Sequence, residues 1–295
     1  MRVIGVYPPI ATPFTSAGAL DTAALAANIE RWNETGLHGY VVAGSNGESP
    51  HLEDEEVAEA VRVARRAANG TQLVIAGTGR QSTAATIRLT RACADAGADV
   101  ALVMNPSFFP AELTADALAR HYEAVAEASP IPILVYNVPK FTHLNIPVPV
   151  VARAAQHPNI VGIKDSAGDI GQIIDLLRAC PREFSVLLGN APAFLSGLQV
   201  GAVGGVLALA NVAPRECVAI YDLLREGSAD EATAIQFRLM PVGRAVTSQF
   251  GVPGLKAALD LLGYRGGSPR LPLQPLDPAR REVLRGILAE AGLLA

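Results

Sequence analysis

Lys164 is the residue of this sequence best suited to covalent chemistry. It follows residues 160–163, whose unbroken apolar and glycine character predicts a short strand buried on both faces. The chain has three lysines against 21 arginines, so arginine serves as its ordinary surface cation. A desolvated lysine can lose its proton, which arginine cannot do, and the neutral amine can form a Schiff base with a carbonyl. The alternative is a structural lysine paired with a carboxylate such as Asp165, and this segment alone leaves both open.

Other polar side chains follow apolar segments in the same way. Ser45 and Asn46 lie between two glycines, where hydroxyl, amide and backbone N–H groups could bind a carboxylate. A tight turn with Ser45 as a helix cap is the alternative. Tyr136 ends a further apolar segment. Its phenol could relay protons beside a Schiff-base lysine, or it could be an aromatic side chain with a packing role only.

The elements that carry these residues alternate between two kinds. Short apolar segments with the character of strands are each followed by turn residues and a longer alanine-rich amphipathic segment. Eight such strands with intervening helices predict a (β/α)8 TIM barrel, in which the residues after each strand meet at one face. The strands are expected at 4–7, 39–43, 73–76, 100–104, 133–136, 160–163, 185–188 and 203–207, and the helices at 22–35, 54–68, 83–96, 114–128, 148–156, 170–179 and 192–200.

A doubly wound open sheet is the alternative architecture. It would usually carry a glycine-rich phosphate-binding sequence after its first strand, and residues 8–12 do not have one. After residue 211 only helices are predicted, at 214–226, 230–250, 255–262 and 278–291. We therefore expect a barrel over residues 1–225, which carries the active site, and a C-terminal helical extension over 226–295 packed on it.

Composition excludes several classes of protein. The formal net charge is −4 without a basic block, which argues against nucleic-acid or membrane-surface partners. No apolar stretch of about 18 residues and no signal peptide are present, so we expect no membrane span. Three scattered cysteines indicate a reducing compartment, and we expect the cytoplasm. The five histidines lack the spacing of metal ligands, so we expect neither a metal nor another cofactor.

Four motifs in this order resemble those of the dihydrodipicolinate synthase/N-acetylneuraminate lyase superfamily of Schiff-base aldolases. They are Gly-Ser-Asn-Gly-Glu at 44–48, Tyr-Asn-Val-Pro at 136–139, Gly-Ile-Lys-Asp-Ser at 162–166 and Gly-Ala-Val-Gly-Gly-Val at 201–206. The resemblance extends over essentially the whole chain. Within the superfamily the sequence is most similar to 4-hydroxy-2-oxoglutarate aldolases and to 2-keto-3-deoxy sugar-acid aldolases.

The resemblance implies a role for each motif. Lys164 would be the Schiff-base lysine and Tyr136 the proton relay, and the family is commonly a homotetramer. The resemblance also implies the residues that bind the 2-oxo acid: Ser45 and Asn46 at its carboxylate and relay, Ser166 at its distal part, and the backbone of Gly189 and Val206 along the pocket.

Two departures from the family pattern bear on specificity. Dihydrodipicolinate synthases carry an arginine two places after the Tyr-Asn-Val-Pro motif, where this chain has Phe141. The paired tyrosines usual after the fourth strand, one of which serves the neighbouring subunit, are Phe108 and Phe109 here. His143 stands where glycine is common, and it either reaches the distal part of the substrate or is an exposed loop residue.

From these motifs we expect a class I aldolase that cleaves a 4-hydroxy-2-oxo acid, with pyruvate or a glyoxylate-type compound among the products. A dehydratase or hydratase-lyase acting on a sugar-derived 2-oxo acid through the same imine is the alternative. Dihydrodipicolinate synthase activity ranks below both, and a barrel that only binds a 2-oxo acid ranks last.

Overall fold

Eight parallel strands form the centre of the molecule in the computed structural model, which describes residues 1–294. They are β1 (Gly5–Tyr7), β2 (Gly39–Val42), β3 (Leu73–Gly77), β4 (Val100–Met104), β5 (Ile133–Asn137), β6 (Ile160–Asp165), β7 (Ser185–Leu188) and β8 (Gly204–Val206). From β2 to β8 each strand pairs with the next in the chain, and β8 pairs with β1. A parallel bridge between Pro9 and Val41 nearly closes the barrel. The predicted barrel is confirmed, and the open-sheet alternative is wrong.

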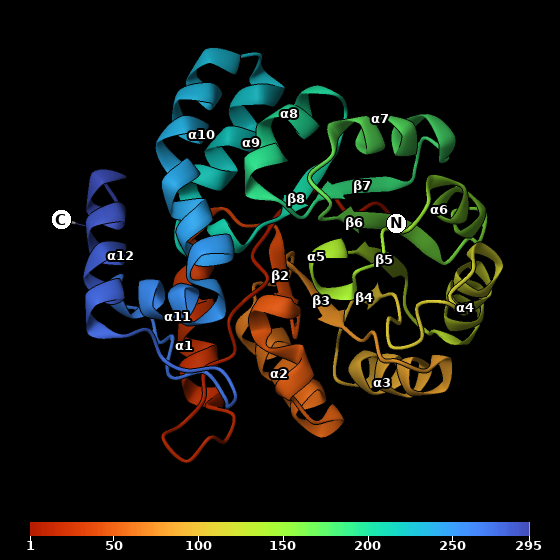
Figure 1. Ribbon diagram of the computed structural model, residues 1–295, viewed down its shortest axis with the longest axis horizontal. Helices are drawn as coiled ribbons and strands as arrows, with labels where there is room; N and C mark the ends of the chain where they lie inside the picture. Colours follow the sequence, from red (N-terminus) through yellow and green to blue (C-terminus); the bar gives the residue numbers. More distant parts are fainter. Residues whose placement is uncertain (295) are drawn as a thin grey trace.

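Helices surround the barrel (Figure 1). Several begin at a side chain that accepts a backbone N–H, such as Asp21, Ser82, Thr114 and Asp169, which satisfies donors at the helix start. A short extra turn, α5 (Pro139–Thr142), follows β5. The helices that follow the strands are α1 (Thr22–Trp32), α2 (Asp54–Ala67), α3 (Thr83–Asp95), α4 (Ala115–Ala128), α6 (Val148–Ala154), α7 (Ile170–Ala179), α8 (Phe194–Gln199) and α9 (Pro214–Glu226).

The hydrophobic core has two layers, because successive side chains of a strand point to opposite faces of the barrel wall. The outer layer packs the strands against the helices and includes Trp32 and Ile163. The inner layer fills the barrel and includes Leu134, Tyr136 and Val206. Since Ile163 belongs to the outer layer, the alternation along β6 directs the next side chain, that of Lys164, into the barrel.

The C-terminal part forms a further helical layer beside the barrel (Figure 1, blue). It consists of α10 (Ala229–Arg244), a π-helical segment η6 (Ala245–Gln249), α11 (Gly251–Leu261) and α12 (Pro278–Glu290). In this layer α10 packs on α9, while α11 packs on α12 and also contacts η2 (Ser45–Gly47), the 3-10 turn after β2. The appended layer therefore reaches the active-site face. A domain boundary at residue 225 stays a prediction.

Several elements begin or end a few residues away from the predicted bounds, and two of these differences lie next to the site. The strand expected to end at residue 163 continues through Lys164 and Asp165, because both pair with β5 and β7 on either side. The helix expected over 230–250 changes to π-helix after Arg244. Pro241, which has no backbone N–H to donate, lies within the last turn before this change.

Candidate active site

Lys164 lies near the end of β6, where it points into the barrel and is only 2% exposed. Its Nζ is 4.0 Å from the centre of the Tyr136 ring, on the neighbouring strand β5. The two residues are partners in the register of these parallel strands. Among residues 1–294, Lys164 forms no ion pair. The amine therefore lies against an aromatic face, without a carboxylate partner.

Asp165, the carboxylate that could have made Lys164 a structural cation, has other partners. Its Oδ2 accepts hydrogen bonds of 2.7 Å from the amides of Asn137 and Gln172, and its Oδ1 accepts one of 3.0 Å from the backbone of Ala167. Burial raises the pKa of Asp165. The side chain points away from the barrel interior, as expected for neighbours on a strand. The structure thus disfavours the ion-pair alternative that the sequence left open.

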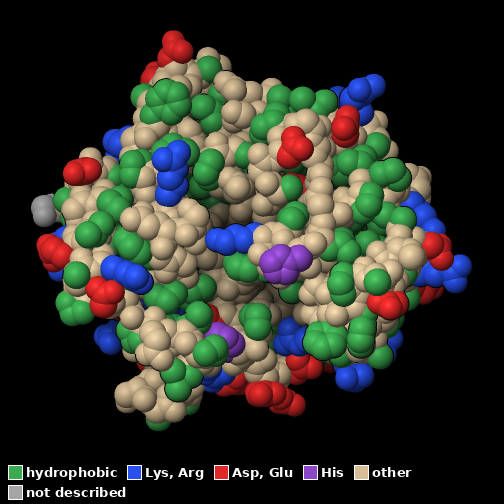
Figure 2. Space-filling view, in the orientation of Figure 1, with side chains coloured by type: hydrophobic (Ala, Val, Ile, Leu, Met, Phe, Trp, Pro, Cys, Tyr) green, Lys and Arg blue, Asp and Glu red, His purple; other side chains and the backbone are tan. Residues whose placement is uncertain are grey.

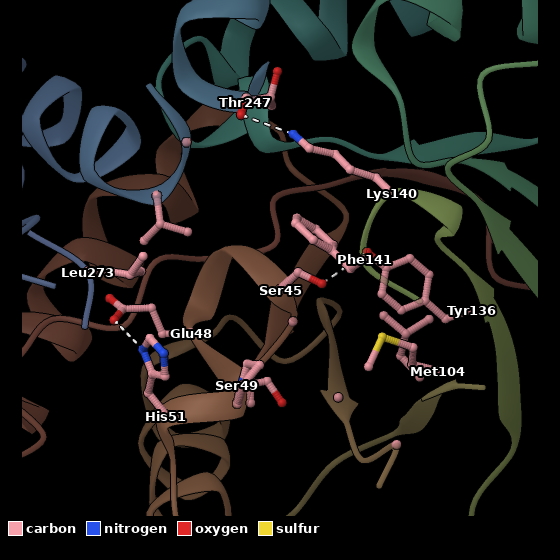
Figure 3. A pocket seen from close by; sticks show the side chains of 18 of the residues that line it. Ser45, Glu48, Ser49, His51, Met104, Tyr136, Lys140, Phe141, Thr247 and Leu273 are labelled. Carbon is pink, nitrogen blue, oxygen red and sulfur yellow. Dashed lines mark hydrogen bonds and ion pairs between the residues drawn. The ribbon is translucent and has the colours of Figure 1, made fainter. Parts of the chain in front are cut away.

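Tyr136 connects the lysine to the loop after β2. The Tyr136 hydroxyl lies 3.3 Å from the Ser45 Oγ, and either oxygen can be the donor (Figure 3). Ser45 begins the turn η2, and Gly44 before it has extended backbone. Two hydroxyl groups and the lysine amine are therefore brought together from three different strand ends. This arrangement can pass a proton between a bound substrate and the serine-tyrosine pair.

Two cavities open at this end of the barrel. The one that contains Lys164 has a volume of about 220 Å³ and is bordered by Asn46, Ser166, Gly189 and Val206, among other residues. The other, of about 650 Å³, is lined by Leu102, Met104, Phe250 and other mainly apolar residues. Ser45, Tyr136, Lys140, Phe141 and Thr247 border both cavities. Figure 2 shows the hollow in this face of the molecule, with a basic side chain at its edge.

Lys140 and Phe141 lie between the two cavities. Lys140 reaches from α5 towards η6, where its Nζ donates to the Thr247 carbonyl at 3.4 Å (Figure 3). Phe141 lies near Ser45 in the same view and is 55% exposed. These two residues, together with Ser45 and Tyr136, form a partition between a small polar chamber and a larger apolar one.

The polar chamber contains side chains with free hydrogen-bonding capacity. The Ser166 Oγ and the Asn190 Oδ1 are both buried atoms without a hydrogen-bond partner among the described residues. Such atoms are costly unless a ligand or water satisfies them. Gly189 lies against Ser166, because a Cβ at this position would come within 1.9 Å of the Ser166 Oγ and 3.0 Å of the Lys164 Cε. The lack of a side chain at 189 therefore makes room for both groups.

The turn that carries Ser45 is held by a buried ion pair. Glu48 is the last residue of this sequence motif and has left-handed backbone, with φ +58°. Its Oε1 lies 2.6 Å from the Lys256 Nζ on α11, and both side chains are almost fully buried. Its Oε2 accepts hydrogen bonds from the backbone N–H of Arg270, at 2.9 Å, and from His51, at 3.2 Å. The C-terminal layer thus fixes the turn after β2.

The predicted site residues mostly come together. The chamber of Lys164 is bordered by every predicted residue except His143: Lys164, Tyr136, Ser45, Asn46, Ser166, Gly189 and Val206. His143 is exposed, has left-handed backbone at the end of α5 and borders neither cavity. Its role in substrate binding stays a prediction.

Three residues near the site were not predicted. Lys256 is one of only three lysines, and this rarity was a signal that could have drawn attention to it. Lys140 is another of the three. Arg244, which borders the Lys164 chamber from the end of α10, gave no signal because it is one of 21 arginines. Residues 1–294 contain no cluster of three His, Cys, Asp or Glu side chains that could hold a metal.

Comparisons with known proteins agree with this geometry. The sequence model of the Dihydrodipicolinate synthetase family matches residues 2–291. The chain is 39% identical over 291 residues to a 4-hydroxy-tetrahydrodipicolinate synthase of Methanoculleus marisnigri, with 98% of this chain and 99% of the relative covered. None of the helices in residues 1–294 has the length and apolar character needed to cross a membrane.

Solved structures of similar proteins have the same fold. A chloride-inhibited dihydrodipicolinate synthase from Acinetobacter baumannii, complexed with pyruvate, matches with a TM-score of 0.94, 31% identity and full coverage of both chains. A monomeric dihydrodipicolinate synthase variant matches with a TM-score of 0.94 and 31% identity, over 99% of this chain and 98% of the variant.

Proposed function

Because the chain belongs to the dihydrodipicolinate synthetase family, a family of lyases, we propose that Lys164 forms a Schiff base with a 2-oxo acid and that the protein cleaves a 4-hydroxy-2-oxo acid. The observation that carries this proposal is the buried Lys164 amine, which has no carboxylate partner and lies 4.0 Å from the Tyr136 ring centre. A neutral amine in this setting is a nucleophile, whereas a paired ammonium is not.

The reaction begins with attack of the Lys164 amine on the C2 carbonyl carbon. The carbinolamine that forms loses water to give an iminium ion, which can accept an electron pair. Tyr136, which has given its own proton to the water that left, then removes the proton of the C4 hydroxyl, the C3–C4 bond breaks, and an aldehyde leaves. The electron pair of the broken bond stays on the pyruvate enamine. Proton return to C3 and hydrolysis of the imine release pyruvate and restore the amine.

The remaining residues orient the substrate. Ser45 and Asn46 border the chamber close to Tyr136 and are suited to hydrogen-bond the C1 carboxylate. Ser166 has a free hydroxyl oxygen, which is available to the C4 oxygen or to groups beyond it. No metal or other cofactor has a part in this scheme.

A second candidate is the activity named for the relatives, 4-hydroxy-tetrahydrodipicolinate synthase. It would use the same pyruvate imine in the synthetic direction, so that pyruvate is consumed instead of released. Full-length similarity at 39% identity favours this candidate. Phe141 at the position of the family's arginine, and Phe108 and Phe109 in place of its tyrosines, favour the aldolase. A dehydratase that uses the same imine would leave the carbon chain intact.

Reduction with borohydride in the presence of pyruvate tests the imine, because reduction makes the bond to the lysine permanent. We expect one adduct, found by peptide mass spectrometry on Lys164 and absent from Lys256, the other buried lysine. Lys164→Arg should give no adduct, and a folded wild-type protein without an adduct would refute the proposal. Pyruvate release from 4-hydroxy-2-oxoglutarate distinguishes the two activities: release supports the aldolase, and a Lys164 adduct without release supports the second candidate.

Assembly and location belong to the same proposal. We infer a homotetramer and a cytoplasmic location from the family resemblance and the scattered cysteines. The similarity to a monomeric variant means that this fold also exists as a single chain. Sedimentation or light scattering of the purified protein measures the assembly directly, and a monomer in solution would contradict the tetramer without affecting the imine chemistry.

A further inference from the structure

The charges around the Lys164 chamber are all of one sign. Lys140, Lys164 and Arg244 border it, and none of the described residues that border it is acidic. This arrangement stands out in a chain that has 28 acidic against 24 basic side chains. A cavity with several cations and no carboxylate attracts anions and raises their local concentration. One carboxylate, at C1 of the substrate, does not account for all of this charge.

Arg244 differs from the other two cations. Lys164 is the amine that reacts, and Lys140 borders both cavities while donating to the Thr247 carbonyl. Arg244 borders only the chamber that contains Lys164, and it forms no ion pair within residues 1–294. Its planar guanidinium group can bind a carboxylate through two parallel hydrogen bonds.

The position of Arg244 follows from the break in the C-terminal layer. It is the last residue of α10, directly before the π-helical segment η6. Ser248 of that segment borders the same chamber, and its hydroxyl lies 3.4 Å from the Arg244 carbonyl. Short π-helical segments are frequent at functional sites. The helix therefore changes its winding where it meets the rim of the chamber.

The chamber also has two free polar atoms. The buried Ser166 Oγ and Asn190 Oδ1 have no partner among the described residues, and both side chains border the chamber. A hydroxyl donor and an amide suit the C4 oxygen of a substrate. Ala191, Pro192 and Ala208 border the chamber as well and supply no polar side-chain group. A volume of about 220 Å³ also favours a short substrate over a long one.

We propose that Arg244 binds the distal carboxylate of the substrate, so that the chamber selects short 2-oxo dicarboxylates over 2-oxo acids with an uncharged chain. This inference rests on the proposed imine chemistry at Lys164. It places recognition of the second anion on the appended helical layer, in a chain whose short helix α5 carries Phe141. A sugar acid without a second carboxylate would leave the guanidinium group without an anionic partner.

The test compares ligands that differ in one charge. Pyruvate, 2-oxoglutarate and the 5-methyl ester of 2-oxoglutarate are each titrated, and the concentration that gives half-maximal borohydride trapping on Lys164 is measured. For wild type we expect 2-oxoglutarate to be trapped at about tenfold to a hundredfold lower concentration than its ester, the worth of one charge-assisted hydrogen-bond pair. Arg244→Gln should remove most of this preference, and Arg244→Lys should keep part of it.

Two matched variants make the result specific. Arg88→Gln removes an exposed arginine of α3 that borders neither cavity and should keep the wild-type preference. Lys140→Gln should also keep the preference for 2-oxoglutarate over its ester. If Lys140→Gln loses this preference while Arg244→Gln retains it, the assignment to Arg244 is wrong. Equal trapping of 2-oxoglutarate and its ester by wild type would refute the anion site while leaving the imine intact. Absence of every adduct, pyruvate included, would refute the imine proposal itself.

Discussion

The buried pair of Glu48 and Lys256 gives a prediction that joins stability to activity. The two charges are 2.6 Å apart, with side chains 0% and 1% exposed. The Lys256 Nζ also donates to the Ser268 carbonyl at 3.0 Å and lies 4.3 Å from the centre of the Phe14 ring. Lys256→Met keeps most of the side-chain volume and removes the charge. It leaves the Glu48 carboxylate buried without its cation.

The expected loss of folding stability is large because an unpaired buried charge is not solvated by water. Removing one partner of a buried pair costs about 3–5 kcal/mol. Burial lowers the pKa of Lys256, although the contact with Glu48 opposes this effect, so the charged lysine is not strongly stabilised in the fold. The pair is therefore expected to fix position more than to add net stability. Glu48→Gln combined with Lys256→Met should then lose clearly less than the sum of the two single changes.

Urea unfolding of the four proteins of this double-mutant cycle measures the stability, and borohydride trapping of pyruvate measures the site. Because Glu48 follows Ser45 by one turn, through a backbone hydrogen bond of 3.2 Å, we expect slower trapping in the folded single variants. The control is Glu59→Gln, which breaks the half-exposed pair of Glu59 with Arg62 and should cost less than about 1 kcal/mol. If Lys256→Met costs no more than Glu59→Gln, the reasoning about the buried pair is wrong.

Two further predictions concern the site and the acid stability of the barrel. Gly189→Ala should slow pyruvate trapping by about tenfold or more, because the new Cβ meets Ser166 and Lys164. The control is Gly70→Ala, since a Cβ at position 70 has no atom within 4 Å. Equal trapping rates in the two variants would contradict the packing argument. Burial lowers the pKa of His121 to about 4. The unfolded chain therefore binds more protons than the fold between about pH 6.5 and 4, and stability should fall by up to about 1.4 kcal/mol per pH unit as the pH decreases through this window. His121→Gln should flatten that slope in pH-dependent unfolding, while the exposed His143→Gln should not.

The barrel could be predicted from the sequence because its signals are local. Alternation of apolar and amphipathic segments placed most elements within a few residues, and β4, α7 and α9 were predicted with their observed bounds. The end of β6 was missed because Lys164 and Asp165 are polar in the sequence. Their strand conformation depends on pairing with both neighbouring strands, which no local pattern shows.

The site was predictable where a residue follows a strand, and less so where the C-terminal layer contributes. Lys164, Tyr136 and Ser45 end or follow apolar segments, so the barrel topology brings them to one face. Arg244 lies about 80 residues beyond Lys164 in the chain, on a helix whose π-helical ending cannot be inferred from helix periodicity. The role of Lys256 could not be predicted, because the sequence does not show that Glu48 from the turn after β2 is buried beside it.

The positions of Lys164 and Lys256 explain why the chain has lysine and not arginine there. Lys164 and Lys256 are both buried near the active-site face, but only Lys256 has a carboxylate partner. The same side chain is thus paired with a carboxylate at one position and left without a carboxylate partner at the other. Exchange of Lys256 for arginine would keep a charge but add a larger planar group to a fully packed site, and exchange of Lys164 would remove the proposed nucleophile. The difference between the two lysines is their carboxylate neighbour. Glu48 forms an ion pair with Lys256, whereas Asp165 points out of the barrel, accepts a hydrogen bond from Asn137 and forms no ion pair with Lys164.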